Sequence, residues 1–166
     1  LEITLPQAFL DTATYPITID PTFGLTTIGA TSLVTDASYI RGSLFACSEA
    51  GTATSMSLYL DDFPSYDKLL FQAIYLDSDR SRVGYTVEVV TATGDLAAWK
   101  TLNISVGGSL SATNYYLAYA HNTSLTVKYD SGGTSAYHTY TYAYPPPDPW
   151  DETAWSTHKF SIYCTY

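Results

Sequence analysis

The sequence predicts an all-β fold, an antiparallel β-sandwich. Helical periodicity never persists along the chain, whereas β-branched and aromatic residues recur in short blocks separated by Gly, Asp, Ser and Pro. Blocks with this regular spacing are typical of a sandwich and not of a parallel sheet that alternates with helices. The chain has 166 residues, of which 46% are hydrophobic and 14% charged, so it can bury the core of one domain.

About nine blocks have the composition of strands. They are Ser38–Cys47, Thr52–Leu60, Lys68–Leu76, Val83–Thr91, Ala98–Val106, Asn114–Ala120, Ser124–Tyr129, Ala136–Tyr144 and Lys159–Tyr166. In the second block, Met56, Leu58 and Leu60 alternate with more polar residues, which predicts a strand with one buried face. Turn-forming residues such as Ser131-Gly132-Gly133 separate the blocks.

Three stretches of the chain carry a resemblance to known proteins. They are Tyr39–Ser43 leading into the Thr52 strand, Tyr115–Tyr119 followed by Tyr129–Gly133, and the closing Lys159–Tyr166. Together they resemble jelly-roll, carbohydrate-binding-module-like β-sandwich modules of secreted, surface and phage structural proteins. The resemblance implies a jelly-roll-like sandwich over residues 26–166, and because strand patterns carry it, it implies fold and not activity.

Residues 1–25 lie outside that resemblance and form a predicted N-terminal arm. Within the arm, Thr14–Ile19 alternates so that Tyr15, Ile17 and Ile19 share one face of an extra strand. Two alternatives remain open for this strand. It is an edge strand of its own domain, where Pro16 is tolerated, or it is donated to the sheet of a neighbouring copy.

Charge argues against two classes of partner. The formal net charge is -9, and the Lys and Arg residues form no cluster. Phosphate backbones and anionic membranes are poor partners for such a chain. No apolar run approaches the roughly 18 residues that span a bilayer. We therefore expect neither nucleic-acid binding nor membrane insertion.

Several features suggest an oxidising, extracellular environment. The chain begins at Leu1 without an initiator methionine, which we interpret as a processed, secreted chain found outside the cell or at its surface. Cys47 and Cys164 lie far apart in a sequence rich in Ser, Thr and Tyr. We expect a disulfide between them, with two buried free thiols as the alternative. Such a bridge typically stabilises a fold by about 2–4 kcal/mol.

Two sequence motifs match the acceptor pattern for N-linked glycans. They are Asn103-Ile104-Ser105 and Asn122-Thr123-Ser124. Asn103 opposes an apolar face of its strand, and Asn122 falls in a predicted turn. Both are therefore expected to be exposed, and covalent glycans are expected partners.

No catalytic, cofactor or metal site is predicted. His121, His138 and His158 lack metal-ligand spacing. A nucleophile elbow, a Walker-type loop and a dinucleotide-binding glycine fingerprint are all missing. The acidic pairs on predicted loops, such as Asp77 with Asp79, match no calcium-loop template. We expect a protein that is not an enzyme.

Aromatic residues are unusually abundant, with 16 Tyr and 3 Trp. Alternation in the Ala136–Tyr144 block places Tyr140 and Tyr142 on one face, and Trp150 and Trp155 follow. Three interpretations remain open. These rings fill the core with their polar tips in water, form a sugar-stacking platform, or form a subunit interface.

These observations favour an extracellular structural subunit that self-assembles into a glycosylated filament or sheath. Donation of the N-terminal strand to the next copy is a head-to-tail contact, and such contacts generate open fibres. The main alternative is a carbohydrate-binding or adhesion module, in which Tyr140, Tyr142, Trp150 and Trp155 stack on an external sugar. A virion structural protein is the remaining hypothesis.

Overall fold

The computed structural model confirms an all-β, antiparallel fold. It describes residues 20–37, 39–62, 68–91 and 97–166, and none of these is helical. The predicted donor strand, with Tyr15, Ile17 and Ile19, lies outside the described residues. The strands are β1 (Thr22–Gly24), β2 (Thr31–Thr35), β3 (Tyr39–Ala46), β4 (Gly51–Thr52), β5 (Ser55–Asp62), β6 (Lys68–Leu76), β7 (Arg82–Thr86), β8 (Val89–Thr91), β9 (Ala98–Gly107), β10 (Ser109–Leu110), β11 (Asn114–His121), β12 (Leu125–Thr139), β13 (Ala154–Phe160) and β14 (Ile162–Thr165).

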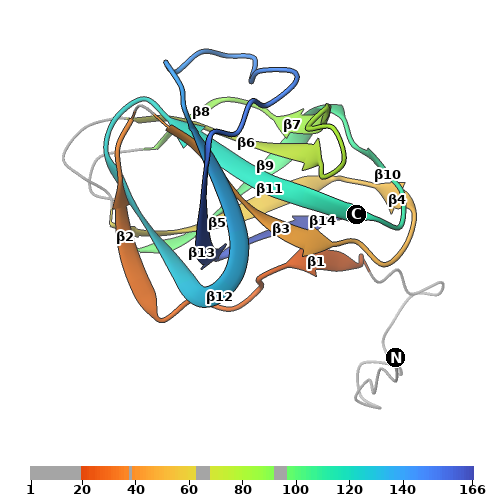
Figure 1. Ribbon diagram of the computed structural model, residues 1–166, viewed down its shortest axis with the longest axis horizontal. Coiled ribbons are helices and arrows are strands. Elements are labelled where there is room, and N and C mark those ends of the chain that lie inside the picture. The colour runs from red at the N-terminus through yellow and green to blue at the C-terminus, as the bar shows by residue number, and fades with distance from the viewer. Residues whose placement is uncertain (1–19, 38, 63–67, 92–96) are drawn as a thin grey trace, which may run out of the picture.

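Two layers of sheet pack against each other as a sandwich (Figure 1). One layer has the strand order β1-β14-β5-β9, and the other has the order β7-β6-β11-β3-β12-β13. The pairing of β9 with β7 joins the layers on one side. On the other side, β12 pairs with β2 and β5 through residues 125–129 and with β3 through residues 135–139, so it passes from one layer to the other.

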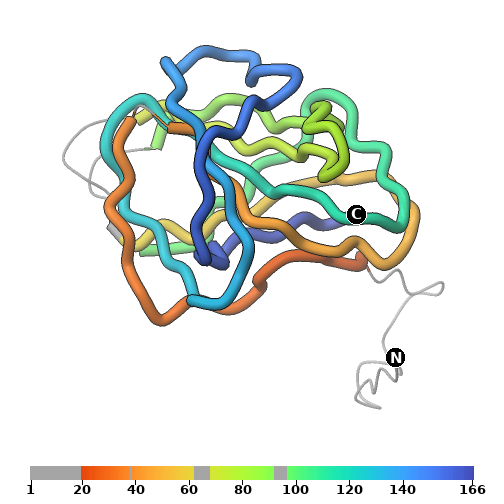
Figure 2. Tube along the Cα trace, in the orientation of Figure 1, coloured from red at the N-terminus to blue at the C-terminus, as the bar shows by residue number. Residues whose placement is uncertain are grey.

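The second layer is buried on both faces. On β6, Leu70 and Ile74 face the inner core between the layers, whereas Phe71 and Tyr75 face the outer side. The residues that follow β12, 140–153, fold back over this outer side and cover it (Figure 2). Because both faces are covered, β11 is buried at every position after Asn114. Such a strand is a continuous apolar run and not an alternating one.

The predicted alternation of β5 is confirmed, since Met56, Leu58 and Leu60 are fully buried. The prediction for β12 was wrong. Two strands with a turn at Ser131-Gly132-Gly133 were expected, and one bent strand is observed. Its register with β13 shifts between Ser131 and Ser135, and Gly132 has φ +87°, a conformation that only glycine adopts without strain.

Two other predicted strands are each divided. The block 83–91 breaks after β7, where the Thr86 hydroxyl accepts a hydrogen bond from the backbone N–H of Gln72 at 3.0 Å. A side chain thus takes the place of a ladder partner, and β8 resumes at Val89. The closing block breaks at Ser161 and begins earlier than expected, at Ala154. The short strands β1, β2, β4 and β10 were not predicted.

Candidate functional site

Trp150 is a core residue, which corrects its predicted place in a sugar-stacking platform. It is 1% exposed. Its ring centroid lies 5.3 Å from that of Tyr75 and 5.5 Å from that of Tyr116. Its backbone N–H donates to the Arg80 carbonyl at 3.0 Å. With neighbouring side chains packed against its ring, Trp150 cannot stack on an external sugar.

Trp155, by contrast, is 55% exposed and lies beside a charged cluster. The Arg80 guanidinium carbon lies 5.7 Å from its ring and 4.6 Å from the ring of Tyr116. Arg80 also forms ion pairs with Asp77 at 3.1 Å and with Glu152 at 2.8 Å. We call these five residues the Arg80 patch. It combines an exposed indole with hydrogen-bonding groups, and the positive charge of Arg80 is neutralised by the two carboxylates of the same patch.

Tyr140 and Tyr142 are half-buried against Phe71. The Tyr142 hydroxyl donates to Glu88 Oε1 at 2.7 Å, and burial together with that carboxylate raises the pKa of Tyr142. The Tyr140 hydroxyl donates to the Ala143 carbonyl. Both hydroxyls are therefore occupied by contacts within the chain. The sequence predicts these tyrosines on one face of a strand, but β12 ends at Thr139, and the two rings instead pack over the outer face of the second layer.

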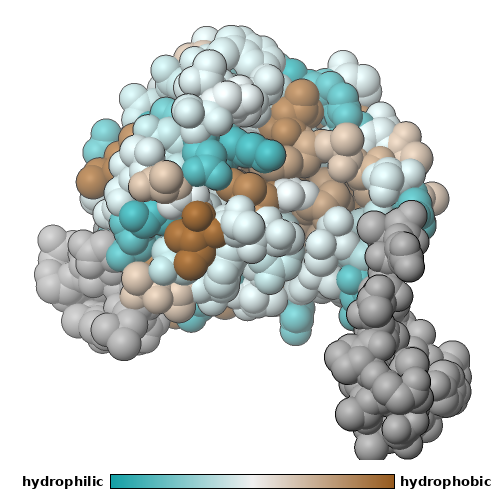
Figure 3. Space-filling model, turned by 90° about the horizontal axis from the view of Figure 1, so that it is seen from below, coloured by the Kyte–Doolittle hydropathy of each residue, from teal (hydrophilic) through white to brown (hydrophobic). Residues whose placement is uncertain are grey.

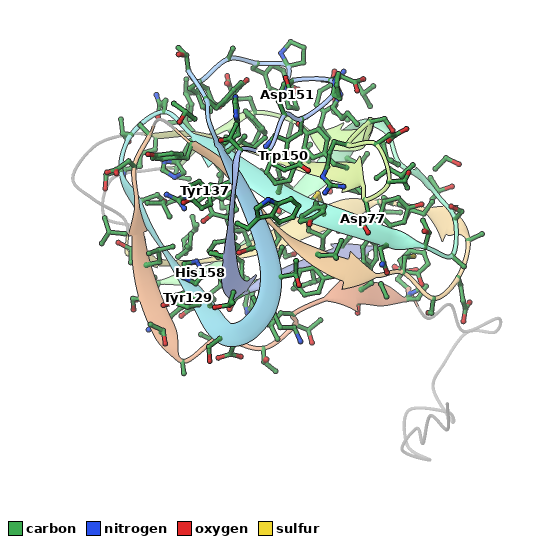
Figure 4. All side chains as sticks on the ribbon, in the orientation of Figure 1. Asp77, Tyr129, Tyr137, Trp150, Asp151 and His158 are labelled. Carbon is green, nitrogen blue, oxygen red and sulfur yellow. The ribbon has the colours of Figure 1, made fainter. Side chains whose placement is uncertain are left out.

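A second arginine, Arg41, lies on β3 at the end away from the Arg80 patch. It is on the inner face of the sandwich, like its register partner Tyr119. The Arg41 guanidinium carbon lies 4.6 Å from the ring of Tyr39 and 4.9 Å from the ring of Tyr137. Burial lowers the pKa of His158, and the charge of Arg41 lowers it further. Tyr137 and His158 lie in the space between β2 and the β12–β13 pair (Figure 4). We call Arg41, Tyr39, Tyr137, His158 and Tyr119 the Arg41 site.

Neither arginine cluster was predicted from the sequence. The alternation Tyr39-Ile40-Arg41 is visible in the sequence and places Tyr39 and Arg41 on one face of a strand. The other ring cannot be found in this way, because Tyr137 reaches Arg41 only through the register of β3 with β12.

The strands β1 and β2 form one edge of the first layer. Each has a single pairing partner among the described strands, β14 for β1 and β12 for β2. Since β14 and β12 both pair with β5, the strands β1 and β2 follow each other along the same side. Val34 on β2 is 65% exposed, and Ile28 between the strands is 52% exposed. The view from below Figure 1 shows hydrophobic residues exposed on the surface (Figure 3). We call residues 22–35 the β1–β2 edge.

The two glycan acceptor motifs lie in different surroundings. Asn103 and Ser105 are exposed on β9. Asn122 is half-buried at the end of β11, and its Oδ1 accepts a hydrogen bond from the Leu69 N–H at 2.9 Å. Its own backbone N–H donates to the Leu69 carbonyl at 3.2 Å. Asn103 is therefore the more accessible acceptor.

Cys47 and Cys164 are buried in the inner core as free thiols, which differs from the expected disulfide. Each Sγ donates to a nearby backbone carbonyl, that of Glu49 at 3.1 Å and that of Thr165 at 3.5 Å. Burial raises the pKa of Cys164 to about 12, and the charge of Cys47 contributes to that rise. The structure thus brings the two cysteines into one cluster, and the bridge itself stays a prediction.

The three histidines are dispersed. His121 is buried, with Nε2 2.7 Å from the Thr35 hydroxyl and Nδ1 donating to the Thr123 carbonyl. Within the described ranges, no three His, Cys, Asp or Glu side chains come together in a way that could hold a metal ion. Nor do these ranges contain an apolar helix of the length needed to cross a bilayer.

No protein-family model matches the chain, and no curated protein sequence matches it.

Proposed function

We propose that this protein is an extracellular structural subunit that polymerises head to tail, with the strand Thr14–Ile19 of one copy added to the β1–β2 edge of the next. The β1–β2 edge carries this proposal, because it is an edge without a second strand partner among the described residues and it exposes Val34. Unpaired backbone groups on an exposed edge strand are templates for pairing with another chain.

The arm has the pattern that such an edge requires. An added strand would continue the two faces of β2, on which Leu33 and Thr35 point inward and Val34 points outward. Tyr15, Ile17 and Ile19 share one face of the arm and would extend the inner core beside Leu33. Because the donor and the acceptor are different surfaces of one chain, the contact does not close on itself and yields open fibres.

Secretion, glycosylation and a jelly-roll topology belong to the same proposal. The exposed motif at Asn103 supports a glycosylated outer surface. The passage of β12 from one layer to the other supports the jelly-roll interpretation. Intact-mass measurement of the chain purified from its source tests both acceptor motifs and the expected Cys47–Cys164 bridge, which removes two hydrogens.

Negative-stain microscopy of the full chain tests the proposed polymer. The wild-type protein is expected to form fibres, and the double variant Ile17→Asp with Ile19→Asp is expected to remain monomeric with an unchanged circular-dichroism spectrum. Val34→Lys removes a methyl-rich contact worth about 1.5 kcal/mol, so it should raise the concentration needed for fibres about tenfold.

The matched control for Val34→Lys is Val106→Lys, which places the same charge on a valine that is 50% exposed on β9. This variant should polymerise as the wild type does. Fibres of unchanged abundance in the Ile17→Asp, Ile19→Asp protein would contradict strand donation.

A carbohydrate-binding function is the second candidate, and the exposed indole of Trp155 in the Arg80 patch favours it. Exposed indoles stack on apolar sugar faces, while neighbouring carboxylates and guanidinium groups bond to hydroxyls. A glycan array with Trp155→Ala decides this point. Binding that survives the substitution would rule out the stacking role of Trp155.

A further inference from the structure

Arg41 is held in a fixed orientation and forms no ion pair within the described part of the chain. Its guanidinium lies between Tyr39 and Tyr137, whose own rings meet edge to face at 5.8 Å. Of the three arginines of the chain, Arg80 and Arg82 form ion pairs with carboxylates. The described residues provide no ion pair and no hydrogen bond to the Arg41 side chain, and its Nε is buried without a partner.

Burying the Arg41 guanidinium in this way is energetically unfavourable unless another group supplies a counter-charge or hydrogen bonds. A half-buried guanidinium loses hydration, and it normally recovers that loss through a carboxylate or through several hydrogen bonds. Stacking on two aromatic rings returns only part of the loss, about 0.5–1 kcal/mol for each ring at a solvent-accessible position. Arg41 therefore has the properties of a group arranged for an external anion.

Tyr119 and His158 supply two more hydrogen-bonding groups to the Arg41 site. Tyr119 is 0% exposed, and its hydroxyl lies beside that of Thr35. Tyr119 is the register partner of Arg41 on the neighbouring strand β11. His158 Nδ1 is buried and unpaired, and the ring of Tyr129 lies 4.2 Å from the His158 ring.

We infer that the Arg41 site binds a carboxylate, with the Arg41 guanidinium as its principal donor and the Tyr119 hydroxyl and His158 ring as further hydrogen-bonding groups. A planar guanidinium matches a planar carboxylate through two parallel hydrogen bonds. The site offers one fixed positive charge, since burial and Arg41 together keep His158 neutral near pH 7. One cation suits a singly charged carboxylate better than a phosphate dianion, which usually recruits several cations.

The carboxylate has two possible sources that share this chemistry. It belongs to a free ligand such as an acidic sugar, or to the N-terminal arm of this chain, whose charged residues before Asp20 are Glu2 and Asp11. The inference does not depend on the proposed polymer, because a free carboxylate would bind a monomer equally well.

Nitrogen-15 NMR of the full chain tests the site through the Nε–Hε signal of Arg41. Sodium glucuronate is the probe, and glucose is the neutral control of similar shape. Glucuronate should shift the Arg41 signal in a saturable manner with a Kd of about 1 mM, which corresponds to about 4 kcal/mol of binding free energy. Glucose should leave the signal unchanged.

Variants separate the guanidinium from general charge, with binding followed through the backbone amides of β3. Arg41→Gln should weaken glucuronate binding at least about tenfold, and Arg41→Lys, which keeps the charge but not the planar fork, should weaken it less. Lys159→Gln removes a cation from the opposite face of β13 and should change nothing. If Arg41→Gln does not fold, Arg41→Lys and the wild-type signal still show whether the Arg41 site binds glucuronate.

The double variant Glu2→Gln with Asp11→Asn shows which of the two sources supplies the carboxylate. If glucuronate shifts the Arg41 signal only in this variant, the arm supplies the carboxylate in the natural protein. If glucuronate shifts the signal in the wild type, the site takes a free ligand. If glucuronate shifts it in neither protein, or glucose shifts it equally, the inference is overturned.

Discussion

Two arginines of this protein are held by aromatic rings in the same way and differ in what neutralises them. In each case the guanidinium lies 4.6 Å from the nearer tyrosine ring. Arg80 is neutralised by Asp77 and Glu152, and these ion pairs join the β6–β7 turn to the segment just before β13. Arg41 has the same aromatic support and forms no ion pair with a described carboxylate. Aromatic support alone therefore does not distinguish the two sites, whereas the ion pairs of Arg80 do.

The largest expected effect concerns the tryptophan packed beside the Arg80 patch. Trp150→Ala should lower the free energy of unfolding by about 4 kcal/mol, because it leaves a large cavity over the second layer. Trp155→Ala should cost less than about 1 kcal/mol, because its ring is largely exposed. Urea unfolding measures both. Equal losses would mean that Trp150 does not form a buried cluster on the outer side of the second layer.

Acidification should lower the free energy of unfolding, because it favours protonation of His121, a buried residue at the Arg41 end of the sandwich. Burial, with a contribution from the charges of Lys68 and Arg41, lowers the pKa of His121 from 6.5 to about 4. The unfolded chain therefore binds the proton more readily than the folded chain does. The stability from neutral His121 is complete above about pH 6.5 and is lost as the pH falls toward 4, by an amount on the order of 3 kcal/mol.

Urea midpoints measured between pH 7 and about pH 4 for the wild type and for His121→Gln check this loss. The variant should have a flatter profile over that range. Parallel profiles would show that His121 does not carry the effect.

Arg80→Gln should destabilise the protein by about 2 kcal/mol, since two partly buried carboxylates lose their counter-charge. The value is below that of a fully buried pair because the Asp77 side chain is 34% exposed. Thermal unfolding at low and at high salt is the measurement, and the difference between variant and wild type should shrink with salt. A neutral outcome would make the Arg80 patch available for a ligand.

Arg41→Gln should have the smallest effect on stability, below about 1 kcal/mol, because it removes ring contacts and no ion pair. The same unfolding experiment measures it beside Arg80→Gln. If Arg41→Gln were the more damaging of the two, Arg41 would be a structural residue and the contrast between the two sites would be wrong.

The fold was predictable from sequence where a strand has one local pattern. The block Lys68–Leu76 matches β6 at both ends, and the buried face of β5 is confirmed. The bend in β12 was not predictable, because the Ser131-Gly132-Gly133 stretch has the composition of a turn and instead lies where the register of β12 with β13 shifts. The platform prediction failed at Trp150 for a related reason. Its burial depends on the fold-back of residues 140–153 over the second layer, which no local pattern encodes.

The central claim is that the N-terminal arm of one copy pairs with the β1–β2 edge of the next. A free peptide of residues 1–20, added in excess to assembling full-length protein, tests this claim most directly by negative-stain microscopy. The peptide should occupy the acceptor edges and shorten or abolish the fibres, and a peptide carrying Ile17→Asp and Ile19→Asp should not. Fibres of the same length with either peptide would contradict the claim.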